Sequence, residues 1–307
     1  MIRLNADCIN CMLKRYLSRI PEHLSEPERL EYMQMICERI GSASKEEGAP
    51  VLVQTIKQEL KLHYGMEEDY SEEKHYFNQM MLRKEAGIEA DIESSVLDTN
   101  DSLICALQYS MTGNYIDFGS MNVVDEEYLG KLIATVDERP ISVDTYENLC
   151  EDLANAGKLA FITDNCGEIV LDKVLIKTIM KQYPQVDITV LVRGGETLND
   201  ATMKDAEEVG MTDLVKVIHN GNDIAGTCLS KLSEEALQCL NESDLILSKG
   251  QANFETLRGC GKNIYYIFLC KCDMFANRFG VEKYTGMFLN DKDYIKMMDG
   301  KTNESNN

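Results

Sequence analysis

The sequence predicts an α/β protein in which a parallel sheet, covered by helices on both faces, follows an all-helical N-terminal region. Two observations carry this prediction. Up to about Ala156, apolar and charged residues interleave at three- and four-residue spacing, which is typical of helices. From Lys158 onward, short apolar runs rich in β-branched residues are each followed by a polar turn and a helical stretch. Strands that alternate with helices imply right-handed crossovers and therefore a parallel sheet.

The change of pattern also sets the expected domain organisation. We predict a helical cap region over residues 1–156 and an α/β domain over residues 157–298. The last segment, 299–307, is polar, and we expect a flexible tail there.

Helix signals are clearest in the first region. A capping box is expected at Ser25 and Glu28, because the serine oxygen can accept from the glutamate amide while the glutamate reaches back. It opens a helix that runs through Ile40. The other helices of this region are expected at 50–63, 72–85 and 101–111.

The second region contains five strand candidates with helices between them. The strands are expected at 159–163, 188–192, 214–218, 245–247 and 264–269. The helices are expected at 168–182, 200–209, 234–240 and 254–260. Such strands are buried on both faces, which explains their continuous apolar runs.

Composition narrows the possible functions. The chain has 31 basic and 52 acidic residues, a formal net charge of −21, which argues against a nucleic-acid partner because phosphate-backbone affinity comes from Lys and Arg. No apolar run reaches the roughly 18 to 20 residues needed to cross a bilayer, and the start lacks an apolar signal segment. We therefore expect a cytoplasmic protein without a membrane partner. Eleven dispersed cysteines favour reduced thiols, and the oligomeric state stays open.

Polar residues gather in the turns that follow the predicted strands. In open parallel sheets, ligands bind at the carboxyl ends of the strands, so these turns are expected to share one edge of the sheet. The turns after the first four strands are residues 163–168, 193–200, 219–223 and 248–255.

The turns suggest a hard divalent cation beside an anion. Asp164, Asn165 and Asp200 offer two carboxylates and an amide oxygen, a set that suits magnesium or manganese, with waters and a substrate phosphate as further ligands. Lys249 would supply a point charge for the phosphate, and the amides near Gly167 would add a helix-start anion site. A structural alternative stays open, because Asp and Asn after a strand often only cap the next helix.

The cysteine pairs allow a second kind of site. Cys8-x-x-Cys11 and Cys270-x-Cys272 have the spacing of zinc half-sites or of a redox pair. The alternative is that Cys8 and Cys11, at i and i+3 of a first helix, pack into the core. The sequence has neither G-x-G-x-x-G after the first strand nor a P-loop pattern, which argues against dinucleotide and P-loop chemistry.

Six short elements occur in order between Asp7 and Gly286. They are Asp7-Cys8-x-x-Cys11, Gly113-Asn114-Tyr115-Ile116-Asp117, and residues 163–168, 193–202, 221–227 and 249–255. Together they resemble the motifs of the metal-dependent damage-control phosphatases, and the cysteine pair is similar to that of the prokaryotic branch. Gly195-Glu196 and Ala252 depart from the family pattern, but no proposed ligand is lost.

The resemblance implies a helical N-terminal region packed on a Rossmann-like α/β/α domain, and hydrolysis of small phosphate esters. It implies that Asp164, Asn165 and Asp200 hold a divalent metal ion (Mg, Mn, Co or Ni) and that Lys249 contacts the phosphate. These four are the expected catalytic residues. Substrate contacts are expected from Asn114, Asp117, Gly167, Glu168, Arg193 and Lys249.

The expected reaction is metal-assisted phosphoryl transfer to water from a small phosphorylated metabolite, such as a sugar phosphate or a damaged cofactor-precursor phosphate. Attack by Asp164, giving an aspartyl-phosphate, is the alternative to attack by water. Two other functions stay open. One is a carboxyl methyltransferase, disfavoured because the first turn is not a glycine-rich loop. The other is a non-catalytic binding module that depends on a metal or on the thiols.

Overall fold

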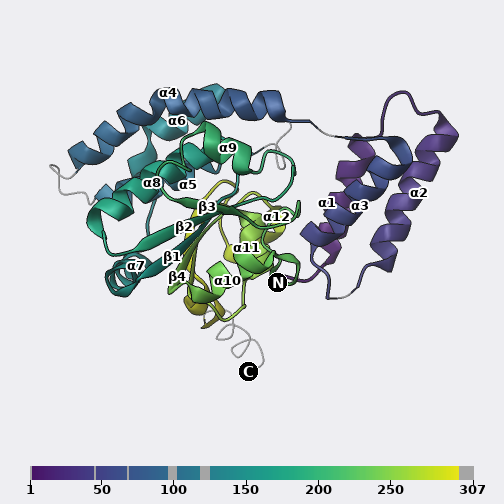
Figure 1. Cartoon of the computed structure of the whole chain (residues 1–307). Helices are drawn as coiled ribbons and strands as arrows, with labels where there is room; N and C mark the ends of the chain where they lie inside the picture. Colours follow the sequence, from purple (N-terminus) through teal and green to yellow (C-terminus); the bar gives the residue numbers. More distant parts are fainter. Residues whose placement is uncertain (1, 45, 68, 96–101, 118–124, 297–307) are drawn as a thin grey trace. The chain divides into compact units, whose positions relative to one another are not determined.

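The computed structural model describes residues 2–44, 46–67, 69–95, 102–117 and 125–296 (Figure 1). Contacts divide the chain into two compact units, Met1–Glu68 and Asp69–Asn307, each with a hydrophobic core. The tail expected over 299–307 lies outside the described residues. None of the helices in the described ranges is long and apolar enough to cross a membrane.

The first unit consists of three helices, α1 (Ala6–Ser18), α2 (Glu26–Ser42) and α3 (Ala49–Tyr64). The expected capping box is present at the start of α2, where the Glu28 carboxylate accepts from the backbone N–H of Ser25 at 2.7 Å and from its hydroxyl at 2.6 Å. Apolar residues at three- and four-residue spacing form the core of the unit. They are Met12, Tyr16, Tyr32, Ile36, Ile40, Leu52, Ile56 and Leu60.

The second unit is built on a six-stranded sheet with the order β3-β2-β1-β4-β5-β6. The strands are β1 (Lys158–Ile162), β2 (Asp187–Val192), β3 (Lys216–His219), β4 (Leu245–Lys249), β5 (Ile264–Leu269) and β6 (Gly286–Asn290). The first five are parallel, and β6 is antiparallel to β5. The strand order reverses direction between β1 and β4, which is the switch point of a doubly wound sheet. The expected Rossmann-like α/β class is confirmed.

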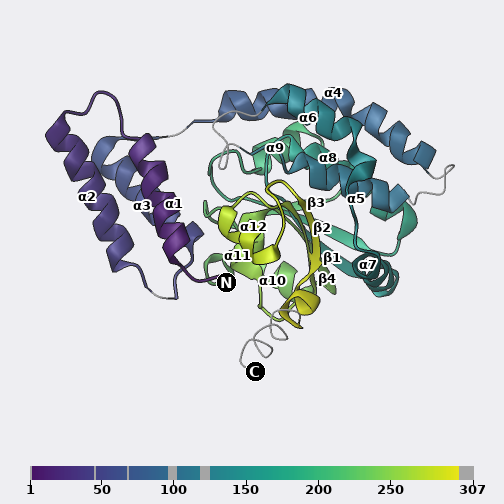
Figure 2. The ribbon, with the colours of Figure 1, turned by 180° about the vertical axis from the view of Figure 1, so that it is seen from behind.

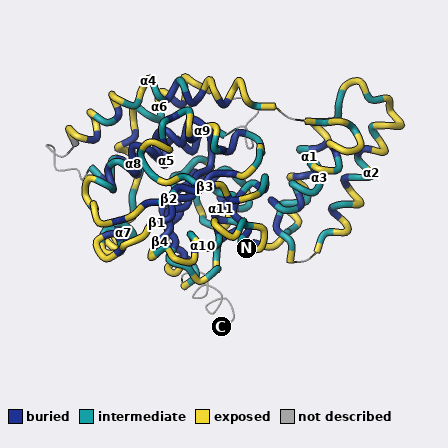
Figure 3. The backbone as a smooth tube through the Cα atoms, viewed as in Figure 1, coloured by how far each residue is buried: buried dark blue, intermediate teal, exposed yellow. Residues whose placement is uncertain are grey.

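Helices cover both faces of this sheet (Figures 1 and 2). The helices are α4 (Ser71–Ser95), α5 (Ser102–Gly113), α6 (Glu126–Ala134), α7 (Val143–Asn155), α8 (Glu168–Gln182), α9 (Met203–Glu208), α10 (Glu234–Glu242), α11 (Gln251–Leu257) and α12 (Asp273–Phe279). Both α4 and α5 pack on α8 on one face, whereas α10 and α11 contact the strands from the other. Strands β4 and β5 are therefore buried along their whole length, and Figure 3 shows the centre of the sheet in dark blue.

The sequence does not predict β6 or α12. The apolar run of β6 is short, at Met287, Phe288 and Leu289, and it is not among the strand candidates of the sequence. The strand forms because it pairs along the edge of β5, with Phe288 opposite Ile267. That pairing partner lies outside the local sequence pattern.

Two predicted elements begin later than expected, and capping explains one of them. The helix expected at 200–209 starts at Met203, because Thr202 caps it: the Asp205 carboxylate accepts from the Thr202 backbone N–H at 2.9 Å and from its hydroxyl at 2.7 Å. The strand expected at 214–218 starts at Lys216, because the amides of the two preceding residues donate to the Met211 carbonyl in a turn.

The contacts divide the chain at 68/69, whereas the sequence places the boundary at 156/157. The helices between these positions share one core with the sheet. Phe77 and Met81 of α4 and Leu107 of α5 lie in the same buried cluster as Leu171 of α8 and Phe161 of β1. Periodicity reports secondary structure, but it does not report which helices share a core.

Gly113 and Gly87 give a matched test of the α5–α8 contact. A Cβ at Gly113 would lie 2.8 Å from Leu171 Cδ1 and 3.3 Å from Glu168 Cα, whereas a Cβ at Gly87, within α4, would meet nothing within 4 Å. We expect Gly113→Ala to lower the free energy of unfolding by about 1–3 kcal/mol through overpacking. Gly87→Ala should raise it by about 0.5–1 kcal/mol through helix propensity. Urea unfolding of both variants measures this, and a gain at both sites would contradict the close contact.

Candidate functional site

Two loops meet beyond the carboxyl ends of β1 and β2. Strand β1 ends at Ile162, so Asp164 and Asn165 lie beyond the extended segment in which neighbouring side chains point to opposite faces. Asn165 forms an isolated antiparallel bridge with Asp200, which follows β2. The structure therefore brings together the three residues that the sequence predicts as metal ligands.

Backbone hydrogen bonds fix this meeting of the loops. The Ala201 amide donates to the Asp164 carbonyl at 2.7 Å, and the Cys166 amide donates to the Asn199 carbonyl at 2.7 Å. Both bonds are short for N–H···O contacts. Main-chain hydrogen bonds thus join the two loops on both sides of the bridge.

The Asp164 carboxylate is buried among groups that contact it closely. Its Oδ2 accepts from the side-chain amides of Asn114 and Asn165, both at 2.9 Å. It also lies against the backbone of Gly250, since a Cβ there would stand 2.0 Å from Asp164 Oδ2. Gly250 has φ +79°, a conformation that glycine adopts readily. A glycine after β4 is therefore required for the carboxylate to occupy this place.

Burial shifts the protonation of both site aspartates. It raises the pKa of Asp164 well above its usual range, and the charges of Asp200 and Glu168 raise it further. Burial also raises the pKa of Asp200, although the neighbouring Arg193 opposes that shift. The fold thus holds carboxylates together against their desolvation and mutual repulsion, a common feature of functional sites.

The guanidinium group of Arg193 forms hydrogen bonds to three other residues of the chain. Its Nε donates to Asp200 Oδ2 at 2.6 Å, Nη1 to Thr227 Oγ1 at 3.5 Å and Nη2 to Asn253 Oδ1 at 3.2 Å. The same Nη2 lies 3.8 Å from Asp164 Oδ1. Every guanidinium nitrogen thus has a partner within the chain, so Arg193 orients the two carboxylates, and a contact with substrate stays a prediction.

Lys249 is fully buried, and its ammonium has three partners. Nζ donates to the Ser110 carbonyl at 2.8 Å, to Glu168 Oε1 at 2.5 Å and to Asp172 Oδ1 at 2.7 Å. An ammonium has three N–H groups, so none is left over. Burial raises the pKa of Asp172 to about 7, although the lysine beside it opposes the shift. The phosphate contact predicted for Lys249 would require these bonds to open.

Groups at the start of α8 also form hydrogen bonds within the chain. Gly167, with φ +67°, donates its amide to Asn78 Oδ1 at 2.6 Å. The Glu168 carboxylate is fully buried and accepts from the side-chain amide of Asn114 at 3.0 Å and from that of Asn165 at 2.8 Å. The predicted anion site at these amides and the predicted substrate contact of Glu168 are therefore occupied by the chain in this conformation.

A second lysine lies near Asp164. Lys271 Nζ donates to Asp117 Oδ2 at 2.6 Å, and Asp117 is its partner in the described part of the chain. Its positive charge acts on Asp164 and lowers the pKa of that carboxyl. An ammonium has three N–H groups, and among the described residues the structure gives an acceptor for one of them. The sequence analysis predicts Asp117 as a site residue but misses Lys271.

The chemistry of the site fits a hard divalent cation. Asn165 Nδ2 donates to Asp164 and Glu168, which leaves its Oδ1 to act as an acceptor. Within the described ranges, no three His, Cys, Asp or Glu side chains are grouped to hold a metal ion. An amide oxygen and ligands from outside the protein would therefore have to complete the shell, as is usual for magnesium.

The cysteines form no disulfide in the described structure. Cys8 and Cys11 lie on α1 as expected, and Cys11 is exposed. Cys270 is buried, and Cys272 precedes α12. Among the residues described, no three His, Cys, Asp or Glu side chains are grouped around these cysteines, so the zinc alternative has no support there.

Four buried side chains of the site escape sequence reasoning. Asp172 has a local signal, because it lies one helical turn after Glu168 on the same face of α8. The others reach the site through contacts between distant parts of the chain, which no local pattern reports. They are Asn78, Ser110 and Asn253.

The fold and the site define a Rossmann-like α/β protein with a cluster of carboxylates and amides at the switch point of its sheet. The chain belongs to the family of the damage-control phosphatase ARMT1-like domain, whose sequence model matches residues 4–287. The predicted family is confirmed.

Relatives from archaea cover most of the chain. It is 30% identical over 289 residues to an uncharacterized protein of Methanocaldococcus jannaschii, with 92% of this chain and 93% of the relative covered. It is 28% identical over 286 residues to the damage-control phosphatase PH1575 of Pyrococcus horikoshii, with coverage of 92% and 96%. A damage-control phosphatase of Archaeoglobus fulgidus is 31% identical over 221 residues, with coverage of 71% and 74%.

A solved structure shares the fold. The crystal structure of a DUF89 family protein from Pyrococcus horikoshii superimposes with a TM-score of 0.77, covering 95% of this chain and 100% of that chain at 24% identity. At that identity, the likeness supports the fold.

The raised pKa of Asp164 predicts a pH-dependent effect of removing its charge. A carboxyl with a higher pKa in the folded chain than in the unfolded chain contributes stability at low pH, and this is lost as pH rises through the folded-state pKa. We expect Asp164→Asn, without metal, to raise the free energy of unfolding at pH 8 by about 0.5–2 kcal/mol and to have less effect at pH 5. Urea unfolding at both pH values measures this. Asp187→Asn, at the opposite end of the sheet, is the control, and a gain independent of pH would contradict the prediction.

Proposed function

We propose that this chain is a metal-dependent phosphomonoester hydrolase acting on small phosphorylated metabolites, such as sugar phosphates or the phosphates of damaged cofactor precursors. The observation that carries the proposal is the convergence of Asp164, Asn165 and Asp200 at the switch point of the sheet. Membership of the damage-control phosphatase family supports the class of reaction. The proposed cofactor is Mg, Mn, Co or Ni.

Asp164, Asn165 and Asp200 would hold the cation, which would polarise a phosphate oxygen and offset its charge. The chain's own contribution is to fix these ligands before anything binds. The amide of Asn114 holds one oxygen of Asp164, and the guanidinium of Arg193 holds one oxygen of Asp200. Groups that are already oriented need no reorganisation when the substrate arrives.

Lys271 is the side chain that we propose for the phosphate. Arg193 and Lys249 already donate to several acceptors of the chain, whereas Lys271 donates to Asp117. A phosphate oxygen could bind the remaining N–H groups of Lys271 without breaking a buried contact. Lys249 instead donates to the Glu168 carboxylate, to which the side-chain amides of the site also donate.

Water is the proposed acceptor of the phosphoryl group. Oδ2 of Asp164 already accepts two amide hydrogen bonds, and Oδ1 faces Arg193. A carboxylate engaged in this way is a weaker nucleophile than a free one. These contacts favour a role for Asp164 as ligand over the formation of an aspartyl-phosphate.

Phosphate release tests the proposal directly. Metal-stripped protein, resupplied with magnesium, manganese, cobalt or nickel, should release inorganic phosphate from members of a panel of sugar and cofactor phosphates. Asp164→Ala should lower turnover by about 100-fold or more, because it removes a ligand of the cation. Asp187→Ala, an exposed carboxylate at the far end of the sheet, should leave it unchanged. No turnover with any metal in folded protein would overturn the proposal and favour the binding module.

Replacing Lys271 tests the phosphate contact. Loss of one charge-assisted hydrogen bond should raise KM for the phosphorylated substrate by about 10-fold or more in Lys271→Ala. Lys271→Arg should restore part of the affinity. Lys283→Ala is the matched control, because Lys283 forms a half-exposed ion pair with Asp273. Equal KM values for Lys271→Ala and wild type would remove Lys271 from the substrate site.

A further inference from the structure

Asn78 of α4 connects the two loops of the site. The side chain is fully buried. Its Oδ1 accepts from the Gly167 amide at 2.6 Å, and its Nδ2 donates to Asp205 Oδ1 at 3.0 Å and to Glu208 Oε2 at 2.9 Å. One side chain thus joins the turn that follows Asp164 to the helix that follows Asp200.

The partners of Asn78 fix the orientation of its amide. A backbone N–H can only donate, so the Gly167 amide requires the oxygen on its side. Ionised carboxylates can only accept, so Asp205 and Glu208 require the NH₂ group on theirs. Both hydrogens of Nδ2 are used. Neither Asp nor Leu, which have nearly the same shape, can make this set of bonds.

The backbones of α4 and of the turn at Gly167 also lie close together. A Cβ on Gly167 would lie 3.1 Å from Phe77 Cβ and 3.3 Å from the Phe77 carbonyl oxygen. Helix α4 therefore abuts the turn at the residue before Asn78. A shift of α4 and a shift of the turn cannot occur independently.

On the other side, the link runs to within two residues of Asp200. Asp205 is the third residue of α9 and completes the capping box with Thr202, because its Oδ2 accepts from the backbone N–H and the hydroxyl of Thr202. Asn78 binds the remaining oxygen, Oδ1. Asn78 and Thr202 thus hold the same carboxylate from opposite sides.

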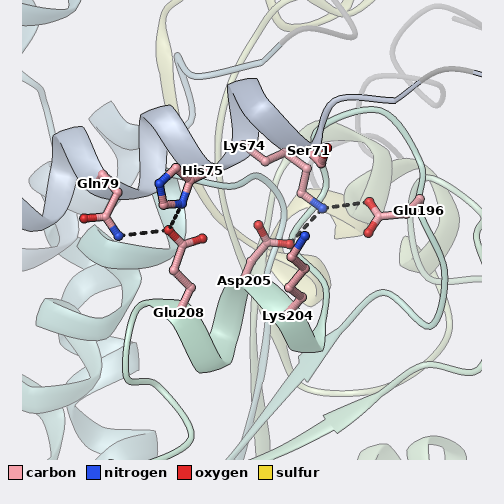
Figure 4. A pocket seen from close by; sticks show the side chains of 8 residues that line it. All are labelled: Ser71, Lys74, His75, Gln79, Glu196, Lys204, Asp205 and Glu208. Carbon is pink, nitrogen blue, oxygen red and sulfur yellow. Dashed lines mark hydrogen bonds and ion pairs between the residues drawn. The ribbon is translucent and has the colours of Figure 1, made fainter.

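Lys74, one turn earlier on the same face of α4, strengthens the link. Its Nζ lies 2.8 Å from Asp205 Oδ2 and 2.8 Å from Glu196 Oε2, in the loop between β2 and α9. Figure 4 shows these contacts along a pocket of about 340 Å³, where Gln79 and His75 both reach Glu208. The face of α4 turned toward α9 is therefore polar.

We propose that Asn78 is a positioning residue, which holds the Asp164–Asn165 turn and the Asp200 loop at the separation that the metal ligands require. The inference rests on the proposed function for its kinetic readout only. The coupling of the two loops is a property of the chain itself, and it is measurable without metal or substrate.

The experiment compares Asn78→Asp and Asn78→Ala with Gln79→Ala. Asn78→Asp keeps the shape and an acceptor for Gly167, but it places a third carboxylate against Asp205 and Glu208. Gln79 is the matched control, because it also donates to Glu208, at 2.9 Å, and the structure assigns it no bond to the Gly167 turn.

The first readout is hydrogen exchange of the metal-free proteins. In both Asn78 variants, we expect the amides of Cys166 and Ala201, which pair the loops, to exchange at least 10-fold faster than in wild type. The amides of β4 should keep wild-type rates, which shows that the fold is intact. Gln79→Ala should leave the loop amides unchanged. Unchanged exchange at both amides in Asn78→Asp would overturn the proposal.

The second readout is Mn²⁺ affinity, followed by electron paramagnetic resonance of the free ion. Loss of a residue that orients metal ligands typically costs 10- to 100-fold in affinity, and we expect that loss in both Asn78 variants. At saturating Mn²⁺, kcat should fall while KM for the phosphorylated substrate changes little. Wild-type Mn²⁺ affinity in the folded Asn78 variants would overturn the proposal. If wild type itself binds no Mn²⁺ and releases no phosphate, the proposed function fails, while loop exchange still decides the role of Asn78.

Discussion

The pairing of two strand-end loops is the constraint on which the candidate site depends. Residues 164–166 and 199–201 belong to separate βα units, yet two short backbone hydrogen bonds and a bridge join them. Because the bonds involve main chain, they join the backbones of the two loops directly at the site aspartates. The side chains then meet in a buried place, where their charges cost free energy. The amides of Asn114 and Asn165 offset part of that cost.

The sequence predicts the parallel part of this fold because each of its strands is a local apolar run between turns. All five parallel strands occur within two residues of their expected starts. Edge strand β6 and the short helix α12 are not among the predicted elements, and β6 depends on pairing with β5. The expected boundary at 156/157 fails to separate the units for the same reason, since α4 and α5 share the core of the sheet.

The sequence predicts only those features of the site that follow from the topology of the sheet. Polar residues that follow parallel strands share one edge, so the meeting of Asp164 with Asp200 follows from the strand order. What those residues bind does not follow. Lys249 was expected to face a ligand, but its ammonium faces Glu168 and Asp172. Spacing along the chain places a lysine at a strand end, whereas the contacts of its amine depend on α5 and α8 packing over it.

The site contains more carboxylates than cations, which explains why each of its cations pairs with a carboxylate. The groups that interact around Asp164 comprise five carboxylates and three cations, namely Asp117, Asp164, Glu168, Asp172 and Asp200 against Arg193, Lys249 and Lys271. With every group ionised, two negative charges stay unbalanced in a chain whose formal net charge is −21. A phosphate approaching such a site is repelled, because the cations already serve the carboxylates. A bound divalent cation would add positive charge to this set. Under the proposed function, a bound divalent cation would offset this negative charge. Burial is the main cause of the raised pKa values of Asp164 and Asp200, so it adds to the free-energy cost that the cation would have to offset.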